Sequence, residues 1–165
     1  MDFGQKLGVT NMKPSSVAAF SFMTIEGRLL WLGDQVPEDA LHTPDRLNHE
    51  GEAYRFVTKN GNATGATIGR ATGVFSYVWD YTSSSRTYRT SREWAILHYD
   101  IKSGPFSQCG DSGAVIVDGK GWIGGLLSLK TEDALDITYA TLFFWLLQRI
   151  KANGFPNAHL DPKRM

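Results

Sequence analysis

A long strand-like stretch interrupted by glycines is the feature that most restricts the fold of this chain. Residues 65–81, GATIGRATGVFSYVWDY, are rich in β-branched and aromatic side chains, which favour a strand. Gly69 and Gly73 fall inside this stretch, and glycines in strand-like sequence often mark bulges or the tight corners of a barrel. The stretch therefore predicts a sheet that curves.

Most other segments also indicate short strands separated by Gly, Asn and Asp. Residues 54–59 alternate between apolar and polar and end at Asn60-Gly61, a pair typical of hairpin turns. AVIVD and WIGGLLSLK, joined by residues 119–121, indicate a buried hairpin, while REWAILHYD and DITYATL supply two further strands. Many short strands predict an all-β domain, either a barrel or a sandwich.

The two ends of the chain differ from this pattern. Residues 16–34, SVAAFSFMTIEGRLLWLGD, can supply two strands around Glu26-Gly27, and the polar residues 35–52, which contain two prolines, indicate a connector. Near the other end, apolar residues recur at helical spacing, which predicts a helix over residues 141–152. The repeating positions are Leu142, Trp145, Leu146 and Ile150.

Composition limits the compartment and the partners. The chain has 165 residues with 42% hydrophobic content, which fits one compact domain or two very small ones. Seventeen basic residues balance seventeen acidic ones, so charge gives no reason to expect nucleic acid or a membrane surface as partner. The N-terminus lacks the apolar run of a secretory signal, and Cys109 is a single cysteine. We therefore expect an intracellular, cytoplasmic protein.

A short run around Ser112 carries a resemblance to a known family. CGDSGAVIV, residues 109–117, places a serine between small flexible residues ahead of an apolar strand, and it resembles the nucleophile motif of chymotrypsin-like (trypsin-like) serine proteases. The likeness continues in order through VTKNGNATGATIGRATGV, REWAILHYD, WIGGLLSL and ITYATLFFWLLQRIK. It covers residues 52–151 and implies a trypsin-like β-barrel, the C-terminal half of that fold, with a C-terminal helix.

The resemblance also divides the chain and assigns roles. It implies an N-terminal segment over residues 1–51, the barrel and helix over 52–152, and a tail over 153–165. Within the barrel, Ser112 matches the nucleophile, and the backbone N–H groups of Gly110 and Ser112 match the oxyanion hole. The substrate-binding positions implied are Phe106, near the base of the side-chain pocket, and Ser128, Leu129 and Lys130, along the cleft edge.

Catalysis by this motif requires a general base as well as the loop that carries the serine. A serine hydroxyl is a weak nucleophile until a base takes its proton. The oxyanion that forms needs preorganised N–H donors, and one lost donor costs about 3 kcal/mol of barrier. Cys109 matches a position that is often disulfide-bonded in secreted family members, and its lack of a partner agrees with a reducing compartment.

The general base is not evident in the sequence. The family carries its histidine and aspartate on a first barrel, but only about fifty residues precede the second barrel here, so the first is absent or much reduced. His42 and His49 lie in the connector and are the candidate bases, although exposed loop histidines are the commoner interpretation. His98 is more typical of an outward-facing strand residue. Asp2 faintly resembles the orienting aspartate.

Three functions stay open at this point. In the first, Ser112 attacks a peptide or a small acyl substrate, with a histidine from the N-terminal segment or a partner chain as base. In the second, the barrel is a non-catalytic module that binds a protein or ligand. In the third, it is a truncation product that is stable only as a homo-oligomer. The face left bare by the missing barrel is expected to be covered by the first fifty residues, a second copy or a partner protein. No cofactor or metal is expected.

Overall fold

The computed structural model describes residues 32–80, 89–130 and 136–160 of the chain, and its fold is mostly β. The helices are α2 (Glu38–His42) and α3 (Phe143–Ala152). The strands are β1 (Arg46–Leu47), β2 (Ala53–Gly61), β3 (Gly65–Asp80), β4 (Arg89–His98), β5 (Val115–Asp118), β6 (Ile123–Lys130) and β7 (Thr138–Leu142).

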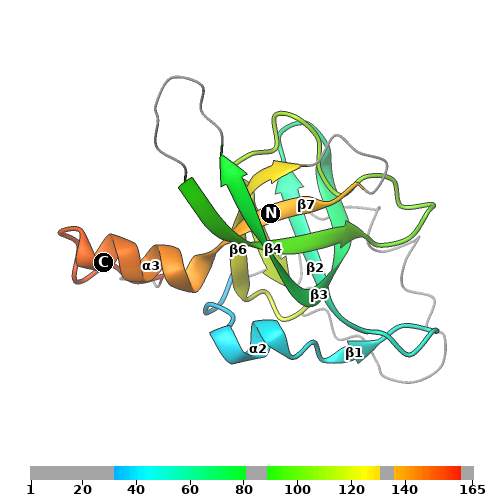
Figure 1. The fold of residues 1–165 in the computed structure, drawn as a ribbon, viewed down its shortest axis with the longest axis horizontal. Helices are drawn as coiled ribbons and strands as arrows, with labels where there is room; N and C mark the ends of the chain where they lie inside the picture. Colours follow the sequence, from blue (N-terminus) through cyan, green and yellow to red (C-terminus); the bar gives the residue numbers. More distant parts are fainter. Residues whose placement is uncertain (1–31, 81–88, 131–135, 161–165) are drawn as a thin grey trace, which may run out of the picture.

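Six of these strands close into an antiparallel barrel. The pairing order is β2–β3–β4–β7–β6–β5, and β5 pairs again with β2, which leaves only the short β1 added at the side of β2. Figure 1 shows α3 extending away from one side of this barrel and α2 lying below it. The expectation of an all-β barrel followed by a C-terminal helix is confirmed.

Both glycines inside β3 have the geometric reasons that the sequence indicates. The register between β3 and β4 shifts between Ala71 and Phe75, and Gly73 within that bulge has φ +78°. A side chain at Gly69 would lie 2.7 Å from the ring of Phe106 and 2.8 Å from the carbonyl oxygen of Leu97. The first glycine therefore permits close packing and the second permits the bend.

The first hairpin turns later than the sequence predicts. Asn60 pairs with Ala66 and Gly61 with Gly65, so both residues of the expected turn lie in the ladder. The turn itself comprises residues 62–64. The physical reason is a carboxylate that is distant in the sequence but in contact with the turn. Asp111 accepts hydrogen bonds from the backbone N–H groups within this turn.

The expected connector over residues 35–52 contains regular structure. Pro37 precedes α2, Glu38 and Asp39 occupy its first turn, and Leu41 is buried. An acidic first turn after a proline favours a helix start, which a count of prolines and polar residues does not reveal. The two strands expected over residues 16–34 fall almost entirely outside the described residues.

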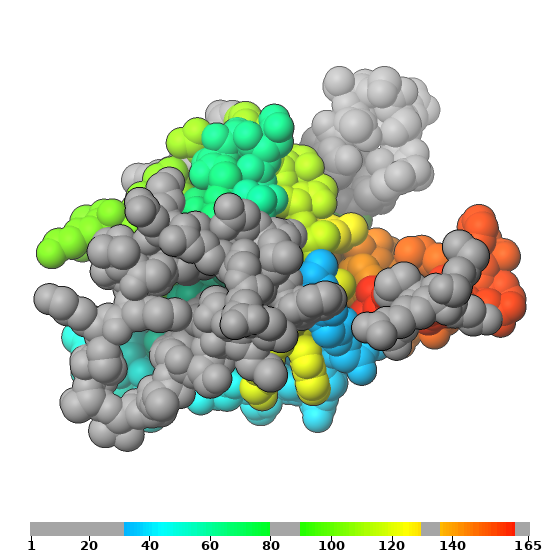
Figure 2. All heavy atoms as spheres, turned by 180° about the vertical axis from the view of Figure 1, so that it is seen from behind, coloured from blue at the N-terminus to red at the C-terminus, as the bar shows by residue number. Residues whose placement is uncertain are grey.

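The main core mixes the barrel with the N-terminal segment. Val36 and Leu41 are each 1% exposed and belong to the same cluster as Trp94, Ile96 and Phe106. Backbone hydrogen bonds from Gly33 to Gly121, from Val36 to Ile123 and from Ile123 to Asp34 attach this segment to the β5–β6 hairpin. In Figure 2 the blue atoms of the segment lie beside yellow atoms of that region. Residues 32–41 therefore cover part of the barrel.

The C-terminal helix begins two residues later than expected. Thr141 pairs with Glu93 on β4 and with Leu126 on β6, and Leu142 pairs with Gly125 on β6. These two residues therefore extend β7 instead of starting the helix. Beyond α3, Leu160 packs against the smaller core cluster around Phe56, so the described part of the expected tail contacts the domain.

Candidate functional site

The loop between β4 and β5 presents Ser112 at the surface. Ser112 is exposed, whereas Asp111 beside it is 1% exposed. Gly110 has φ +99° and Gly113 has φ +83°, conformations that side-chain-bearing residues rarely adopt. These two glycines let the chain reverse sharply on both sides of Ser112, as the sequence indicates.

Some backbone N–H groups of this loop have acceptors and others do not. The Asp111 N–H donates to the Gln108 carbonyl at 3.1 Å, and the Gly113 N–H donates to the Leu127 carbonyl at 2.8 Å. Within the part of the chain that the structure describes, no acceptor takes the N–H of Gly110 or of Ser112. Among the described residues, the N–H of Cys109 has no acceptor either, so the loop leaves three neighbouring donors available, and the oxyanion role of Gly110 and Ser112 stays a prediction.

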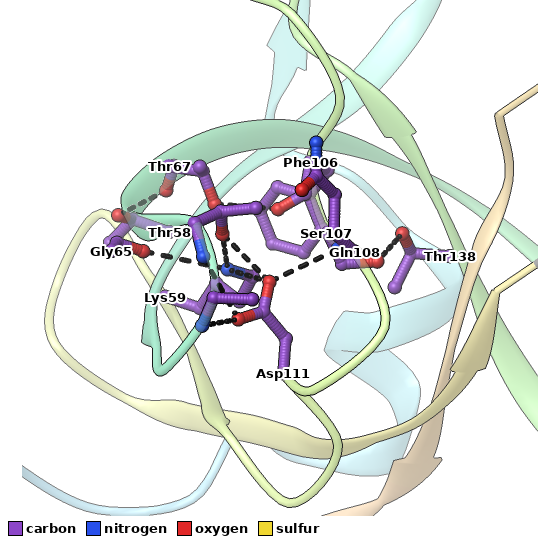
Figure 3. Close-up of polar contacts among 11 residues, drawn as sticks. Thr58, Lys59, Gly65, Thr67, Phe106, Ser107, Gln108, Asp111 and Thr138 are labelled. Carbon is purple, nitrogen blue, oxygen red and sulfur yellow. Dashed lines mark hydrogen bonds and ion pairs between the residues drawn. The ribbon is translucent and has the colours of Figure 1, made fainter.

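The buried Asp111 side chain fixes this loop against the β2–β3 turn, as Figure 3 shows in part. Its Oδ1 accepts from Ala63 N at 2.7 Å and Thr64 N at 3.2 Å. Its Oδ2 accepts from Thr64 Oγ1 at 2.7 Å and Gln108 N at 3.1 Å. Asp111 therefore stabilises both the turn that it reaches and the loop from which it projects.

A buried lysine completes the site. Lys59 Nζ lies 3.0 Å from Asp111 Oδ2, and neither side chain is exposed to solvent. Burial alone raises the pKa of the Asp111 carboxyl, but hydrogen bonds from Thr64, Lys59, Gln108 and Ala63 outweigh burial and hold that pKa below its usual range. Asp111 is thus an anion whose charge is matched inside the protein.

This low pKa predicts how acid affects folding. Because the pKa of Asp111 is lower in the folded chain, the carboxylate adds stability above the ordinary aspartate pKa of about 4, and that contribution disappears as the pH falls toward the folded value. We expect the urea midpoint of the wild type to fall more between neutral pH and about pH 3 than that of Asp111→Asn. Asp39→Asn, an exposed change, should retain the wild-type pH dependence, and equal acid losses in all three proteins would contradict the assignment.

The structure brings the loop that carries Ser112 next to the expected cleft-edge strand. Gly113 and Ala114 exchange backbone hydrogen bonds with Leu127 on β6. Immediately beyond, Leu129 is 39% exposed, and Lys130 ends the strand opposite Thr138. The side chain of Ser128 is directed elsewhere, toward Glu93, with its Oγ 3.1 Å from Glu93 Oε2.

Phe106 lies beneath the Ser112 loop, and none of its surface is exposed to solvent. Its side chain is fully buried in the main core, and Lys59 Nζ lies 5.6 Å from the ring centroid. Its carbonyl accepts from Thr67 Oγ1 at 2.7 Å. In this structure Phe106 supports the Lys59–Asp111 pair, and its expected role near the base of a substrate pocket stays a prediction.

The candidate bases lie on other elements. The ring of His42, at the end of α2, lies 4.5 Å from that of Phe75, and His49 Nε2 lies 3.7 Å from Glu50 Oε1. Among the described residues, no hydrogen bond joins a histidine to Ser112. Asp2 lies outside them. The structure therefore assembles the serine and its loop, while the expected base stays a prediction.

Sequence analysis missed Lys59 entirely. Residues 54–59 alternate between apolar and polar in the sequence, yet every residue from Arg55 to Lys59 is buried. Its partner Asp111 lies within CGDSGAVIV, and the motif by itself assigns Asp111 no role. A lysine in the middle of an otherwise apolar strand is the signal that could have been followed, because a buried cation requires a buried anion.

Comparison with known proteins adds a low level of similarity. No family model matches the chain, and no curated protein matches it. Among solved structures, the active form of the Rv3671c protease from M. tuberculosis is similar at 16% identity with a TM-score of 0.46, covering 67% of this chain. This chain spans 45% of the length of that structure. A likeness at this level does not assign a family or an activity.

Two kinds of feature are absent from the described residues. They contain no helix long and apolar enough to cross a membrane. Nor do they contain a group of three or more His, Cys, Asp or Glu side chains placed to hold a metal ion.

Proposed function

We propose that this chain is a trypsin-like serine hydrolase domain in which Ser112 attacks the acyl group of a peptide or a small acyl substrate. The observation that carries the proposal is the loop itself, with an exposed serine between two glycines of positive φ above a buried Asp111. The N–H groups of Gly110 and Ser112 are the expected donors to the oxyanion. The adjacent strand β6 is the expected edge of the substrate cleft.

The proton of Ser112 needs an acceptor for this chemistry. His42 and His49 stay the candidates within the chain, and a histidine of a second copy or a partner protein is the alternative. The acceptor would take the hydroxyl proton as the Oγ–carbon bond forms and would return it to the leaving group. The resemblance implies no metal or cofactor for this step.

A fluorophosphonate probe tests the nucleophile directly. We expect covalent labelling of Ser112, in which an Oγ–phosphorus bond forms, fluoride leaves and the serine proton passes to the base. Labelling should be lost in Ser112→Ala and retained in Ser91→Ala, an exposed serine on β4. A folded wild type that stays unlabelled from about pH 6 to 9, where a histidine base becomes neutral, would contradict the proposal. If labelling occurs, His42→Ala and His49→Ala show whether either residue sets its rate.

A specific observation favours a second candidate, a non-catalytic binding module. His42 packs on Phe75, and His49 lies beside Glu50, so both candidate bases already have other neighbours. In that case Ser112 would be an ordinary turn residue, and no probe would label it in any oligomeric state. Light scattering on the same sample shows whether the unlabelled protein is a monomer or an assembly.

A further inference from the structure

A cavity of about 530 Å³ lies between the β3–β4 hairpin and the start of α3. Figure 1 shows these two elements at the same side of the barrel. The side chains that matter are those of Tyr77 on β3, Arg92 and Glu93 on β4, Thr141 on β7 and Trp145 on α3. This cavity has no assigned role in the proposed hydrolase.

The most unusual group in the cavity is the carboxylate of Glu93. Glu93 is 3% exposed, and its Oε2 lies 3.1 Å from Ser128 Oγ and 3.0 Å from Thr141 Oγ1. Both partners are neutral hydroxyl groups. None of the ion pairs among the described residues includes Glu93. Among the side chains that the structure describes, which do not include those of Arg89 and Lys130, no cation pairs with Glu93.

Two other buried carboxylates each have a cationic side chain as partner. Asp111 has Lys59 Nζ at 3.0 Å, and Asp118 has Arg55 Nη1 at 3.1 Å. Burying a carboxylate costs several kcal/mol unless a cation or enough hydrogen bonds compensate, as a rough guide. Glu93 has two hydroxyl partners where the other two have a cation, and it lines the cavity.

Arg92, the arginine next to Glu93 in the sequence, is already engaged. Arg92 Nη2 lies 2.8 Å from Glu38 Oε1, and its guanidinium lies 4.9 Å from the centroid of the Phe75 ring. This contact ties α2 to the edge of the cavity and leaves the Glu93 charge unmatched. A cation that compensates Glu93 therefore comes either from a bound ligand or from a side chain outside the described ones.

Aromatic walls favour the same kind of ligand. Tyr77 is 69% exposed and Trp145 is 44% exposed, and both line the cavity. Aromatic rings attract ammonium and guanidinium groups, and Trp145 already has the guanidinium of Arg149 5.2 Å from its ring centroid. A buried carboxylate together with accessible aromatic rings is the chemistry that binds organic cations.

We propose that this cavity binds an organic cation, an ammonium or guanidinium group on an alkyl stem, through its charge to Glu93 and its stem to Tyr77 and Trp145. The same group occurs on a free amine and on the side chain of a lysine or arginine in a partner peptide. Ser112 does not line this cavity, and the inference does not depend on hydrolase activity.

Titration with n-butylammonium, followed by amide chemical shifts of the full chain, tests the site. We expect saturable shifts around Glu93, Thr141 and Trp145 with a dissociation constant on the order of 1 mM, and none with the neutral n-butanol. Glu93→Gln keeps an acceptor for Ser128 and Thr141 but removes the charge, and it should weaken binding at least about tenfold. Trp145→Ala should weaken it about threefold. Ile150→Ala, exposed on the same helix but not lining the cavity, should match the wild type.

Three outcomes of this titration overturn the proposal. Absent saturation, equal binding of n-butanol, or unchanged affinity in Glu93→Gln overturns the proposal. If Glu93→Gln does not fold, the exposed Trp145→Ala decides, and wild-type affinity in that variant overturns it. A capped tripeptide with a central lysine distinguishes the two sources, since binding more than about tenfold tighter than n-butylammonium indicates a peptide and equal binding indicates a free amine.

Discussion

Replacing Lys59 with methionine is expected to lower the free energy of unfolding by about 3–5 kcal/mol, because it leaves Asp111 buried without its cation. Both side chains are fully buried, so water cannot replace the lost ammonium group. Lys59 Nζ also donates to Thr64 Oγ1, and removing it weakens the turn that Asp111 holds. Urea unfolding at neutral pH measures this loss.

The same variant should impair the loop that carries Ser112. Asp111 carries the contacts that keep Ser112 exposed and its flanking glycines in place, so under folding conditions labelling of Ser112 by the fluorophosphonate should slow at least about tenfold. Lys120→Met is the matched control, since Lys120 is 64% exposed and 3.9 Å from Asp45, and it should change stability by less than about 0.5 kcal/mol.

A double variant separates charge from packing. Lys59→Met combined with Asp111→Asn has no buried charge at this site, and it should recover part of the stability that Lys59→Met loses. If Lys59→Met is as stable as Lys120→Met, the pair does not hold the loop. If the double variant is no more stable than Lys59→Met, lost packing rather than an unmatched charge explains the effect.

The barrel was predictable because its signals are local. Gly73 marks the bulge in β3, Gly119-Lys120-Gly121 marks the β5–β6 hairpin, and the apolar spacing after Leu142 marks α3. Each signal acts through the φ angles or the burial of its own neighbours. Signals of this kind can be recognised in the sequence without knowledge of the tertiary contacts.

The supports of the candidate site were not predictable, because they join distant segments. Asp111 moves the first turn from Asn60-Gly61 to residues 62–64 by binding the N–H groups of Ala63 and Thr64. A side chain at Gly61 would clash with Asp111 Oδ1, so Gly61 accommodates the carboxylate. The glycine that suggests a turn in the sequence is therefore explained by a tertiary contact with Asp111.

Strand β2 shows a second limit of pattern analysis. Its residues from Arg55 to Lys59 are all buried, with Val57 in the main core and Phe56 in the smaller cluster. A polar residue in a strand is normally taken as facing solvent. Here Arg55 and Lys59 lie inside because Asp118 and Asp111 meet them there, and no property of β2 alone reveals those partners.

Arg55 connects the N-terminal segment to the barrel. From β2, its Nη1 lies 3.1 Å from Asp118 Oδ2 and 3.7 Å from Asp45 Oδ2, and its Nη2 donates to the Ala40 carbonyl at 2.8 Å. Its side chain is 7% exposed, and that of Asp118 is 2% exposed. One guanidinium group thus satisfies a buried carboxylate and the end of α2 together.

An Arg55→Met variant is therefore expected to lose about 3 kcal/mol of stability. The loss is at the lower end for a broken buried pair, because Asp118 Oδ1 still accepts from the N–H groups of Lys120 and Trp122. Hydrogen exchange at the Leu41 amide, which bonds to Pro37, should accelerate more than exchange in β4 as α2 detaches.

Arg92→Met is the informative control, since Arg92 also ties α2 to the barrel through Glu38 but is 35% exposed. A partly exposed ion pair of this kind contributes about 0.5–1 kcal/mol, so this variant should keep most of its stability and its protection at Leu41. If the two variants lose equal stability, burial does not distinguish these contacts. If Arg55→Met speeds exchange uniformly through the barrel, Arg55 supports the whole fold rather than the attachment of residues 32–45.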